Sequence, residues 1–175
     1  MRVVREPEMT AGSHGGGPAE VRADELAGLR FFESVPRWTL ERLAGSAAKR
    51  RLEQGATVVR KNDEARAVYF LLSGAVQVLV YFEGVGDLLM GVQREPGSLI
   101  GWSAFGPPYR YTSSVRCEEA SELIRLSRET FEEIFEEDPY LGYQILKRVA
   151  AAVDSRLEGA VTFLLETPAT PGSAP

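Results

Sequence analysis

The sequence of 175 residues contains one cysteine and one histidine, Cys117 and His14. A lone cysteine cannot form a disulfide within the chain, and a single histidine cannot join it in a structural zinc site. No apolar run approaches the roughly 18 residues that a membrane-spanning helix needs, and the N-terminus lacks an apolar stretch of signal-peptide length. These absences predict a soluble cytoplasmic protein with no metal site, no cofactor and no contact with a membrane.

The sequence also lacks an excess of positive charge. It has 20 Lys and Arg against 25 Asp and Glu, a formal net charge of −5, which argues against binding to nucleic acid by bulk electrostatics. It contains neither the glycine-rich phosphate loop of nucleotide hydrolases nor a Ser, Cys or His arrangement for covalent catalysis. We therefore expect a protein that is not an enzyme.

What the chain does have is the composition of one globular domain, with 44% hydrophobic and 26% charged residues. The glycine-rich start and the final segment ETPATPGSAP carry too little apolar surface to offset the entropy cost of ordering them. We predict disordered tails at residues 1–22 and 166–175, and a single domain at residues 23–165.

The spacing of apolar residues changes twice along this domain. From Asp24 to about Ala48 they recur at steps of three and four, which predicts two short helices divided by Pro36. Between residues 52 and 126, short alternating runs are separated by glycines, as in antiparallel strands joined by tight turns. Helical spacing returns after Ser127. The predicted fold is α+β or mainly β: an antiparallel β-roll resembling a double-stranded jelly roll, flanked by N-terminal helices and a long C-terminal helix.

The last predicted helix, from about Tyr140 to Leu165, carries an apolar stripe at alternating steps of four and three. The stripe consists of Leu146, Ala150, Val153, Leu157, Ala160 and Leu164. At about 1.5 Å per residue the helix would be nearly 40 Å long and would extend beyond so small a domain. We therefore predict a homodimer interface along the stripe; the alternative is that the stripe covers the roll of its own chain.

Several segments with fixed spacing identify a family resemblance. They are Phe32-x-x-Val35-Pro36-x-x-x-Leu40-x-x-Leu43-Ala44, residues 69–78 (YFLLSGAVQV), residues 96–101 (PGSLIG) and residues 113–117 (SSVRC). Together they resemble the cyclic nucleotide-binding domain of the catabolite activator family and of the regulatory subunits of cyclic-nucleotide-dependent kinases. Gly55, Gly74, Gly97 and Gly101 fall where the family turns. In the loop before Tyr69, where the family usually has glycine, the chain has Asn62, which also accepts a left-handed backbone.

The resemblance also implies a ligand site, from which this sequence departs. In the family, a short helix after the position of Gly101 presents backbone N–H groups to the cyclic phosphate. A glutamate directly after that glycine binds the ribose hydroxyl, and an arginine further on pairs with the phosphate. Here Trp102 occupies the glutamate position and Tyr111 the arginine position, with Arg110 one residue earlier. Both charged partners of a cyclic nucleotide are therefore missing.

Three interpretations of this segment stay open. A cyclic nucleotide binds, with Arg110 replacing the missing arginine and Trp102 or Tyr111 stacking on it. Another small molecule binds to these aromatic side chains and nearby hydroxyls. In the third, Trp102, Phe105 and Tyr111 fill the cavity as core. Because prolines stiffen a loop with polar tips, we favour ligand binding, with contacts from Gly101, Trp102, Ser103, Ala104, Arg110, Tyr111, Thr112 and Ser113.

The function implied by the resemblance is that of a non-catalytic regulatory or sensor module. Its ligand would bias the helices after Ser127 and so alter the surface offered to a protein effector. Transcription factors of the family carry a helix-turn-helix domain beyond the last helix, whereas here ten residues follow Leu165, so we expect no direct DNA binding. The alternative is a ligand-free dimerisation module whose pocket is filled by Trp102 and Tyr111.

Overall fold

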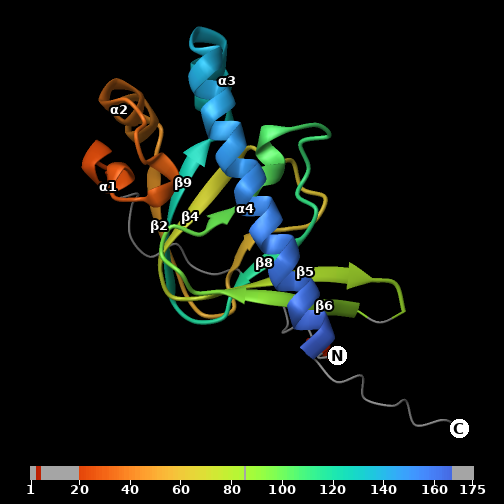
Figure 1. The fold of residues 1–175 in the computed structure, drawn as a ribbon. Coiled ribbons are helices and arrows are strands. Elements are labelled where there is room, and N and C mark those ends of the chain that lie inside the picture. The colour runs from red at the N-terminus through yellow and green to blue at the C-terminus, as the bar shows by residue number, and fades with distance from the viewer. Residues whose placement is uncertain (1–2, 5–19, 85, 167–175) are drawn as a thin grey trace, which may run out of the picture.

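Two antiparallel sheets form a roll, and helices from both ends of the chain pack around it (Figure 1). The computed structural model describes residues 3–4, 20–84 and 86–166. The five-stranded sheet has the order β1 (Val3–Val4), β6 (Gly86–Gln93), β5 (Val76–Phe82), β8 (Ser114–Cys117) and β3 (Thr57–Val59). The four-stranded sheet has the order β2 (Ala48–Leu52), β9 (Ser121–Ser127), β4 (Ala67–Ser73) and β7 (Leu99–Ile100). This architecture confirms the predicted β-roll.

The predicted tails fall mainly outside the described residues. Within the first of them, residues 1–22, Val3 and Val4 pair with Leu88 and Asp87 of β6. Val21 is already buried, two residues before the predicted start of the domain. Of the second predicted tail, residues 166–175, only Glu166 is described, as the last residue of the final helix.

The N-terminal segment forms short helices on either side of Pro36, as the apolar spacing predicts. They are α1 (Ala23–Ala27), the 3-10 helix η1 (Arg30–Phe32) and α2 (Arg37–Gly45), with Pro36 as the N-cap of α2. Figure 1 places α1 and α2 beside β2 and β9. The ring of Phe32 lies 5.1 Å from that of Phe70 in β4, between centroids, so these helices pack on the core through aromatic contacts.

Turns at the end of the roll depend on residues with a left-handed backbone. Gly74, between β4 and β5, has φ +87°, and a Cβ atom there would lie 2.7 Å from the Cα of Ser121 and closer still to the carbonyl oxygen of Ala120. Asn62 has φ +71°, as predicted for the position where the family usually has glycine. The Gly74 turn therefore has no room for a side chain.

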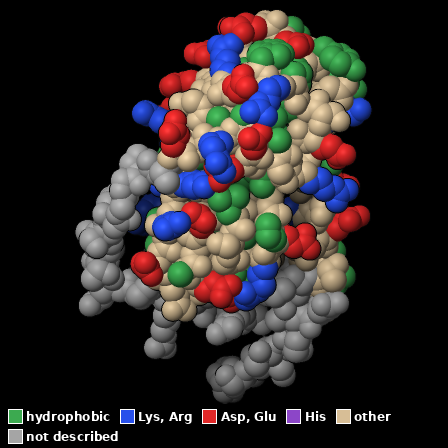
Figure 2. Space-filling model, turned by 90° about the vertical axis from the view of Figure 1, so that its left-hand side faces the viewer, with side chains coloured by type: hydrophobic (Ala, Val, Ile, Leu, Met, Phe, Trp, Pro, Cys, Tyr) green, Lys and Arg blue, Asp and Glu red, His purple; other side chains and the backbone are tan. Residues whose placement is uncertain are grey.

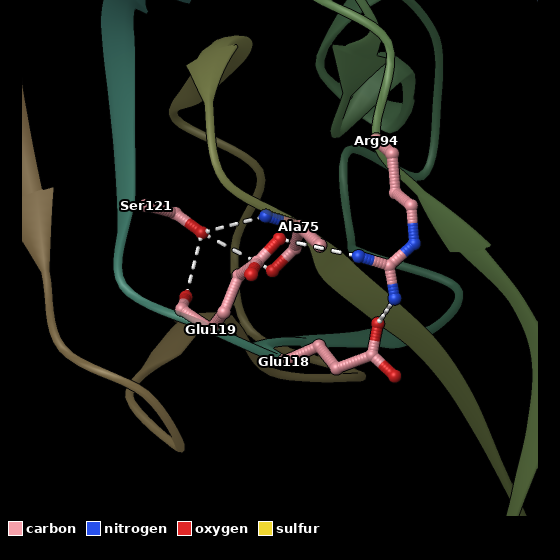
Figure 3. Close-up of polar contacts among 5 residues, drawn as sticks. All are labelled: Ala75, Arg94, Glu118, Glu119 and Ser121. Carbon is pink, nitrogen blue, oxygen red and sulfur yellow. Dashed lines mark hydrogen bonds and ion pairs between the residues drawn. The ribbon is translucent and has the colours of Figure 1, made fainter.

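The same turn is held to the β8–β9 turn by a buried hydroxyl (Figure 3). Ser121 Oγ accepts the N–H of Ala75 at 3.2 Å and lies 3.1 and 2.8 Å from the carbonyl oxygens of Ala75 and Glu119. On the outer side, Arg94 pairs with Glu118 at 2.5 Å and with Glu119 at 3.2 Å. These contacts join the β4–β5 turn, the residue after β6 and the β8–β9 turn at one end of the roll.

Two helices follow the roll, and both begin where the sequence predicts. α3 (Arg128–Glu137) starts after its N-cap Ser127, and α4 (Pro139–Glu166) starts at a proline. The carboxylate of Asp138 accepts the N–H of Leu141 at 3.0 Å. In Figure 1, α4 crosses the front of the roll from α3 to β6, and it contacts α3, β6 and the 3-10 helix η2 (Trp102–Phe105).

One face of α4 packs on the domain and another is exposed. Leu141, Ile145 and Val149 are buried, and Arg148 donates to the carbonyl oxygens of Phe31, at 2.7 Å, and Glu33. Of the predicted dimer stripe, Leu146 is 42% and Leu157 63% exposed, and Ala150 is exposed as well. Val153 and Ala160 are partly buried, and the side chain of Leu164 lies outside the described part. The stripe thus borders the packed face but most of it does not cover the roll.

The surface carries charges of both signs. In Figure 2, basic and acidic side chains are interspersed and hydrophobic ones appear in small separate groups. Arg42 of α2 pairs with Glu133, at 2.9 Å, and with Glu137 of α3, which ties the two helices together. Within the described ranges, no helix is long and apolar enough to cross a membrane, and no cluster of three His, Cys, Asp or Glu side chains could hold a metal ion.

Candidate functional site

A hollow opens where the two sheets meet η2 (Trp102–Phe105) and α4. Its apolar wall comes from strands of both sheets, through Val59, Val78, Ile100 and Val115. Its empty volume is about 330 Å³ including the solvent-open mouth, but the centres of water molecules can occupy only about 20 Å³ of it. That is room for one or two waters, so a larger ligand requires side chains to move.

Gly101 sets the direction in which the chain leaves β7 and enters η2. Its backbone is left-handed, with φ 80° and ψ 31°. A Cβ atom at this position would lie 2.9 Å from Cε1 of Tyr111 and 3.2 Å from the carbonyl oxygen of Ala67. Glycine is therefore required here both for its backbone conformation and for the close approach of Tyr111.

Tyr111 occupies the position where the resemblance places an arginine, and its side chain is hydrogen-bonded within the protein. Its side chain is buried, and its hydroxyl donates to the carbonyl oxygen of Ala67 at 2.8 Å. Burial raises the pKa of this phenol to about 12, so the group is neutral at physiological pH. Its backbone N–H donates to the carbonyl of Asp63 at 3.0 Å, which fixes the residue against the preceding loop.

The predicted contact residues divide between this hollow and its surroundings. Six of them line it: Gly101, Trp102, Ser103, Tyr111, Thr112 and Ser113. Ala104 is buried beside it, and Arg110 is exposed, with Nη1 donating to the carbonyl oxygen of Asn62 at 2.8 Å. In this conformation the guanidinium of Arg110 is therefore not in the hollow, and a ligand contact by Arg110 stays a prediction.

A residue that the sequence reasoning did not consider supplies the positive charge of the hollow. Arg156 of α4 lines it, with its guanidinium carbon 5.5 Å from the ring centroid of Trp102 and Nη2 3.5 Å from the carbonyl oxygen of Leu99. Desolvation lowers the pKa of Arg156 to about 10, which still leaves it charged at neutral pH. Among the side chains that the structure describes, no carboxylate forms an ion pair with it.

One signal in the sequence could have indicated Arg156. Its helical neighbours at three and four residues in either direction are uncharged, namely Ala152, Val153, Gly159 and Ala160. A charged or polar residue at one of these steps could pair with the guanidinium on the helix surface, and without one the partner has to come from another part of the fold. Which part of the fold supplies this partner depends on how α4 crosses the roll.

The lining combines an apolar wall with a few hydrogen-bonding groups. The polar members are the hydroxyls of Ser103, Thr112 and Ser113 and the guanidinium of Arg156. None of the described residues that line the hollow is a histidine, a cysteine or a carboxylate. This set of groups suits the binding of a small molecule and offers no pair of nucleophile and base.

The comparisons with known proteins agree with this geometry. The family model of the cyclic nucleotide-binding domain matches residues 49–138. No curated protein matches the chain. A Geobacter metallireducens GS-15 protein classed as cyclic nucleotide-binding is 28% identical, with a TM-score of 0.66 over 78% of this chain and 98% of its own.

Two further solved structures share the fold at lower identity. A cyclic nucleotide-binding domain from Methylobacillus flagellatus KT is 15% identical, with a TM-score of 0.68 over 84% of this chain and 82% of its own. The sensor domain of the transcriptional regulator DNR from Pseudomonas aeruginosa is 21% identical, with a TM-score of 0.64 over 77% of this chain and 90% of its own. Since the family model covers just over half of the sequence, including β4, β5 and the Gly101 turn, the chain belongs to the cyclic nucleotide-binding domain family.

Proposed function

We propose that the chain is a non-catalytic regulatory module that binds a small ligand in the hollow and signals through α3 and α4. The observation that carries this proposal is that η2, strands of both sheets and Arg156 of α4 line the same hollow. A ligand there touches the C-terminal helix directly. The surface that α4 offers to a protein effector, or to a second copy, then depends on whether the hollow is occupied.

The small size of the hollow suggests how a ligand would act on α4. Because it has room for only one or two waters, a ligand has to displace the side chains that close it, of which Trp102 and Arg156 hold each other across the boundary between η2 and α4. Displacing this pair changes how α4 is held. A ligand that binds the rearranged state more tightly shifts the population of α4 positions by that difference in affinity.

We take cyclic nucleotides as the first candidates for the ligand. The family membership and the similarity to a sensor domain support this choice. Trp102 offers an aromatic face for a base, and the hydroxyls of Ser103, Thr112 and Ser113 can bond to ribose or phosphate oxygens. The binding mode would differ from that of the family because the usual glutamate and arginine are replaced.

The test is the melting temperature of the full chain with and without cyclic AMP, cyclic GMP and cyclic di-GMP in large excess. A ligand at about 100 times its dissociation constant stabilises the fold by roughly 2.7 kcal/mol, a rise of about 5 to 10 °C for a chain of this size. Adenosine and guanosine at the same concentration serve as controls without phosphate. Unchanged melting temperatures with all three cyclic compounds would contradict the assignment of these ligands.

A second candidate function is a ligand-free interaction module. It is favoured by the engagement of Tyr111 with Ala67 and by the small volume of the hollow. The variant Trp102→Ala separates the two functions. If Trp102 is core, the variant loses several kcal/mol of stability and no ligand response changes. If Trp102 is a ligand contact, binding is lost while the melting temperature of the free protein barely moves.

We also propose that α4 pairs two copies of the chain. Leu146, Ala150 and Leu157 form an exposed apolar line, which Val161 and Leu165 extend at 48% and 81% exposure. Exposed leucines and valines repeated at helical spacing are usual at the seam of paired helices. The dimer would bring two hollows close to one interface, since Arg156 and Leu157 are neighbours in α4.

A further inference from the structure

We infer that Arg156 is the charge-recognising group of the hollow, and that its ligand is a small molecule bearing an oxyanion, a phosphate in the first instance. This inference rests on the proposed ligand binding and specifies the chemistry of the ligand and the residue that reads it. The positive charge comes from the helix after the roll, and neither Arg110 nor the Tyr111 position supplies it.

The guanidinium of Arg156 makes little use of its hydrogen-bond donors within the described part of the chain. A guanidinium carries five N–H donors in one plane. In the described part of the chain, the guanidinium makes one hydrogen bond, from Nη2 to the carbonyl oxygen of Leu99 at 3.5 Å, the long limit of such a bond. Contact with the face of the Trp102 ring fixes the guanidinium but uses none of these in-plane donors. The group is therefore held in place with its donors available to a ligand.

Several other described arginines of the domain have close partners. Arg37, Arg42, Arg94 and Arg128 form ion pairs with carboxylates, whereas Arg110 and Arg148 donate to backbone carbonyl oxygens at 2.8 and 2.7 Å. Arg156 is partly buried, lines the hollow beside its apolar wall, and has no carboxylate partner among the described side chains. A desolvated charge without a counter-charge destabilises the folded protein. An anionic ligand would compensate this charge, and a bidentate oxyanion matches the guanidinium geometry.

An anion bound at Arg156 would also change how the second half of α4 is held. The side chains at Ile145 and Val149 anchor the first half of α4 in the core, while Leu157, next to Arg156, is exposed. An anion bound between Arg156 and the Ser103 or Thr112 hydroxyls would tie the second half of α4 to η2 and the loop before β8. The negative charge of the ligand would thus be bound by Arg156 in the same part of α4 that carries the proposed dimer stripe.

The experiment is a calorimetric titration of the full chain and three variants. The probes are cyclic AMP, cyclic GMP, cyclic di-GMP and inorganic phosphate, with adenosine and guanosine as uncharged counterparts. The variants are Arg156→Gln, Arg156→Lys and, as matched control, Arg50→Gln, an exposed arginine of β2 that does not line the hollow. We expect at least one anionic probe to bind the unmodified chain, with a dissociation constant about tenfold higher or more in Arg156→Gln and within about threefold in Arg50→Gln. Arg156→Lys, which keeps the charge but loses the fork, should lie between them.

The salt dependence of the affinity distinguishes a loss of charge recognition from a folding defect. The affinity of the unmodified chain for the anionic probe should fall as salt is raised from about 50 to 500 mM, and that of Arg156→Gln should depend on salt far less. Undiminished binding by Arg156→Gln, or equally tight binding of a nucleoside and its cyclic phosphate, overturns the inference alone. Failure of every anionic probe to bind the unmodified chain overturns the inference together with the proposed function. Binding of inorganic phosphate that Arg156→Gln abolishes would support the inference and show that the phosphate group suffices.

Discussion

The hydroxyl of Tyr111 lies 2.8 Å from the carbonyl oxygen of Ala67 and donates a hydrogen bond to it. This bond joins the loop before β8 to the start of β4 in the interior of the roll. A side chain that, by its position, would face a ligand phosphate in the family is here part of the core. The positive charge of the hollow comes instead from Arg156, which belongs to the helix that follows the roll.

The buried phenol predicts a loss of stability in alkali. Unfolded tyrosine ionises near pH 10, whereas burial raises the pKa of Tyr111 in the folded protein to about 12. Below pH 10 both states are neutral; as the pH rises from about 10 to about 12, the unfolded state loses its proton first and the free energy of unfolding falls. The difference between these two pKa values corresponds to a loss of about 2 to 3 kcal/mol in the free energy of unfolding.

Tyr111→Phe isolates this contribution because both proteins keep every other titrating group, Arg156 included. Near pH 8 the variant should be less stable by about 1 to 2 kcal/mol, since the carbonyl of Ala67 loses its donor. Urea unfolding between pH 8 and 12 should show this difference shrinking once the pH passes about 10 and reversing as the pH approaches about 12. A difference that is constant across this range would contradict the assignment of a buried neutral phenol.

Much of the roll could be predicted from the sequence because its determinants are local. The apolar spacing and Pro36 define the N-terminal helices, and Ser127 and Pro139 mark the starts of α3 and α4. Gly74 and Asn62 adopt the left-handed conformations that their turns require. Each of these features depends on a few consecutive residues, so it can be recognised from the local sequence.

Features that depend on packing between distant segments were not predictable in this way. The alternating spacing expected of a strand does not hold throughout β5, because a bulge between Val78 and Leu79 shifts the register and leaves Leu79, not Val80, fully buried. The place of Arg156 over Trp102 depends on the path of α4 across the roll. Adjacent residues 110 and 111 point to different environments, a choice that the loop sequence does not determine.

Gly74 offers a test of the close approach between the two turns. Gly74→Ala should be more destabilising than Gly55→Ala. Both positions have nearly the same positive φ, +87° and +82°, so an alanine is strained by about 1 to 2 kcal/mol at either. Only at Gly74 would the Cβ meet backbone atoms of Ala120 and Ser121, whereas at Gly55 nothing lies within 4 Å. We expect a further loss of about 1 to 3 kcal/mol in urea unfolding. Equal losses in the two variants would mean that the turns separate easily.

Arg148 should stabilise the attachment of α4 to the N-terminal helices. Its guanidinium donates to the carbonyl oxygens of Phe31 and Glu33, and replacing it with glutamine should cost about 1.5 to 3 kcal/mol. Lys147→Gln is the matched control, because Lys147 is the preceding residue of the same helix and is exposed, so its loss should stay within about 0.5 kcal/mol. Hydrogen exchange should also become faster in the first half of α4 for Arg148→Gln alone. If exchange is unchanged, the helix is held by its apolar contacts and not by Arg148.

The proposed dimer can be tested at Leu157, whose side chain is 63% exposed in the single chain. In a helix pair this leucine would lie at the seam, where an aspartate has to be buried or the pair has to separate. Leu157→Asp should therefore sediment with the mass of one chain, while the unmodified protein sediments with the mass of two. Ser155→Asp adds the same charge to an exposed position two residues away, off the stripe, and should stay dimeric. A single-chain mass for the unmodified protein at tens of micromolar, or an unchanged mass for Leu157→Asp, would show that this line of α4 does not join two copies.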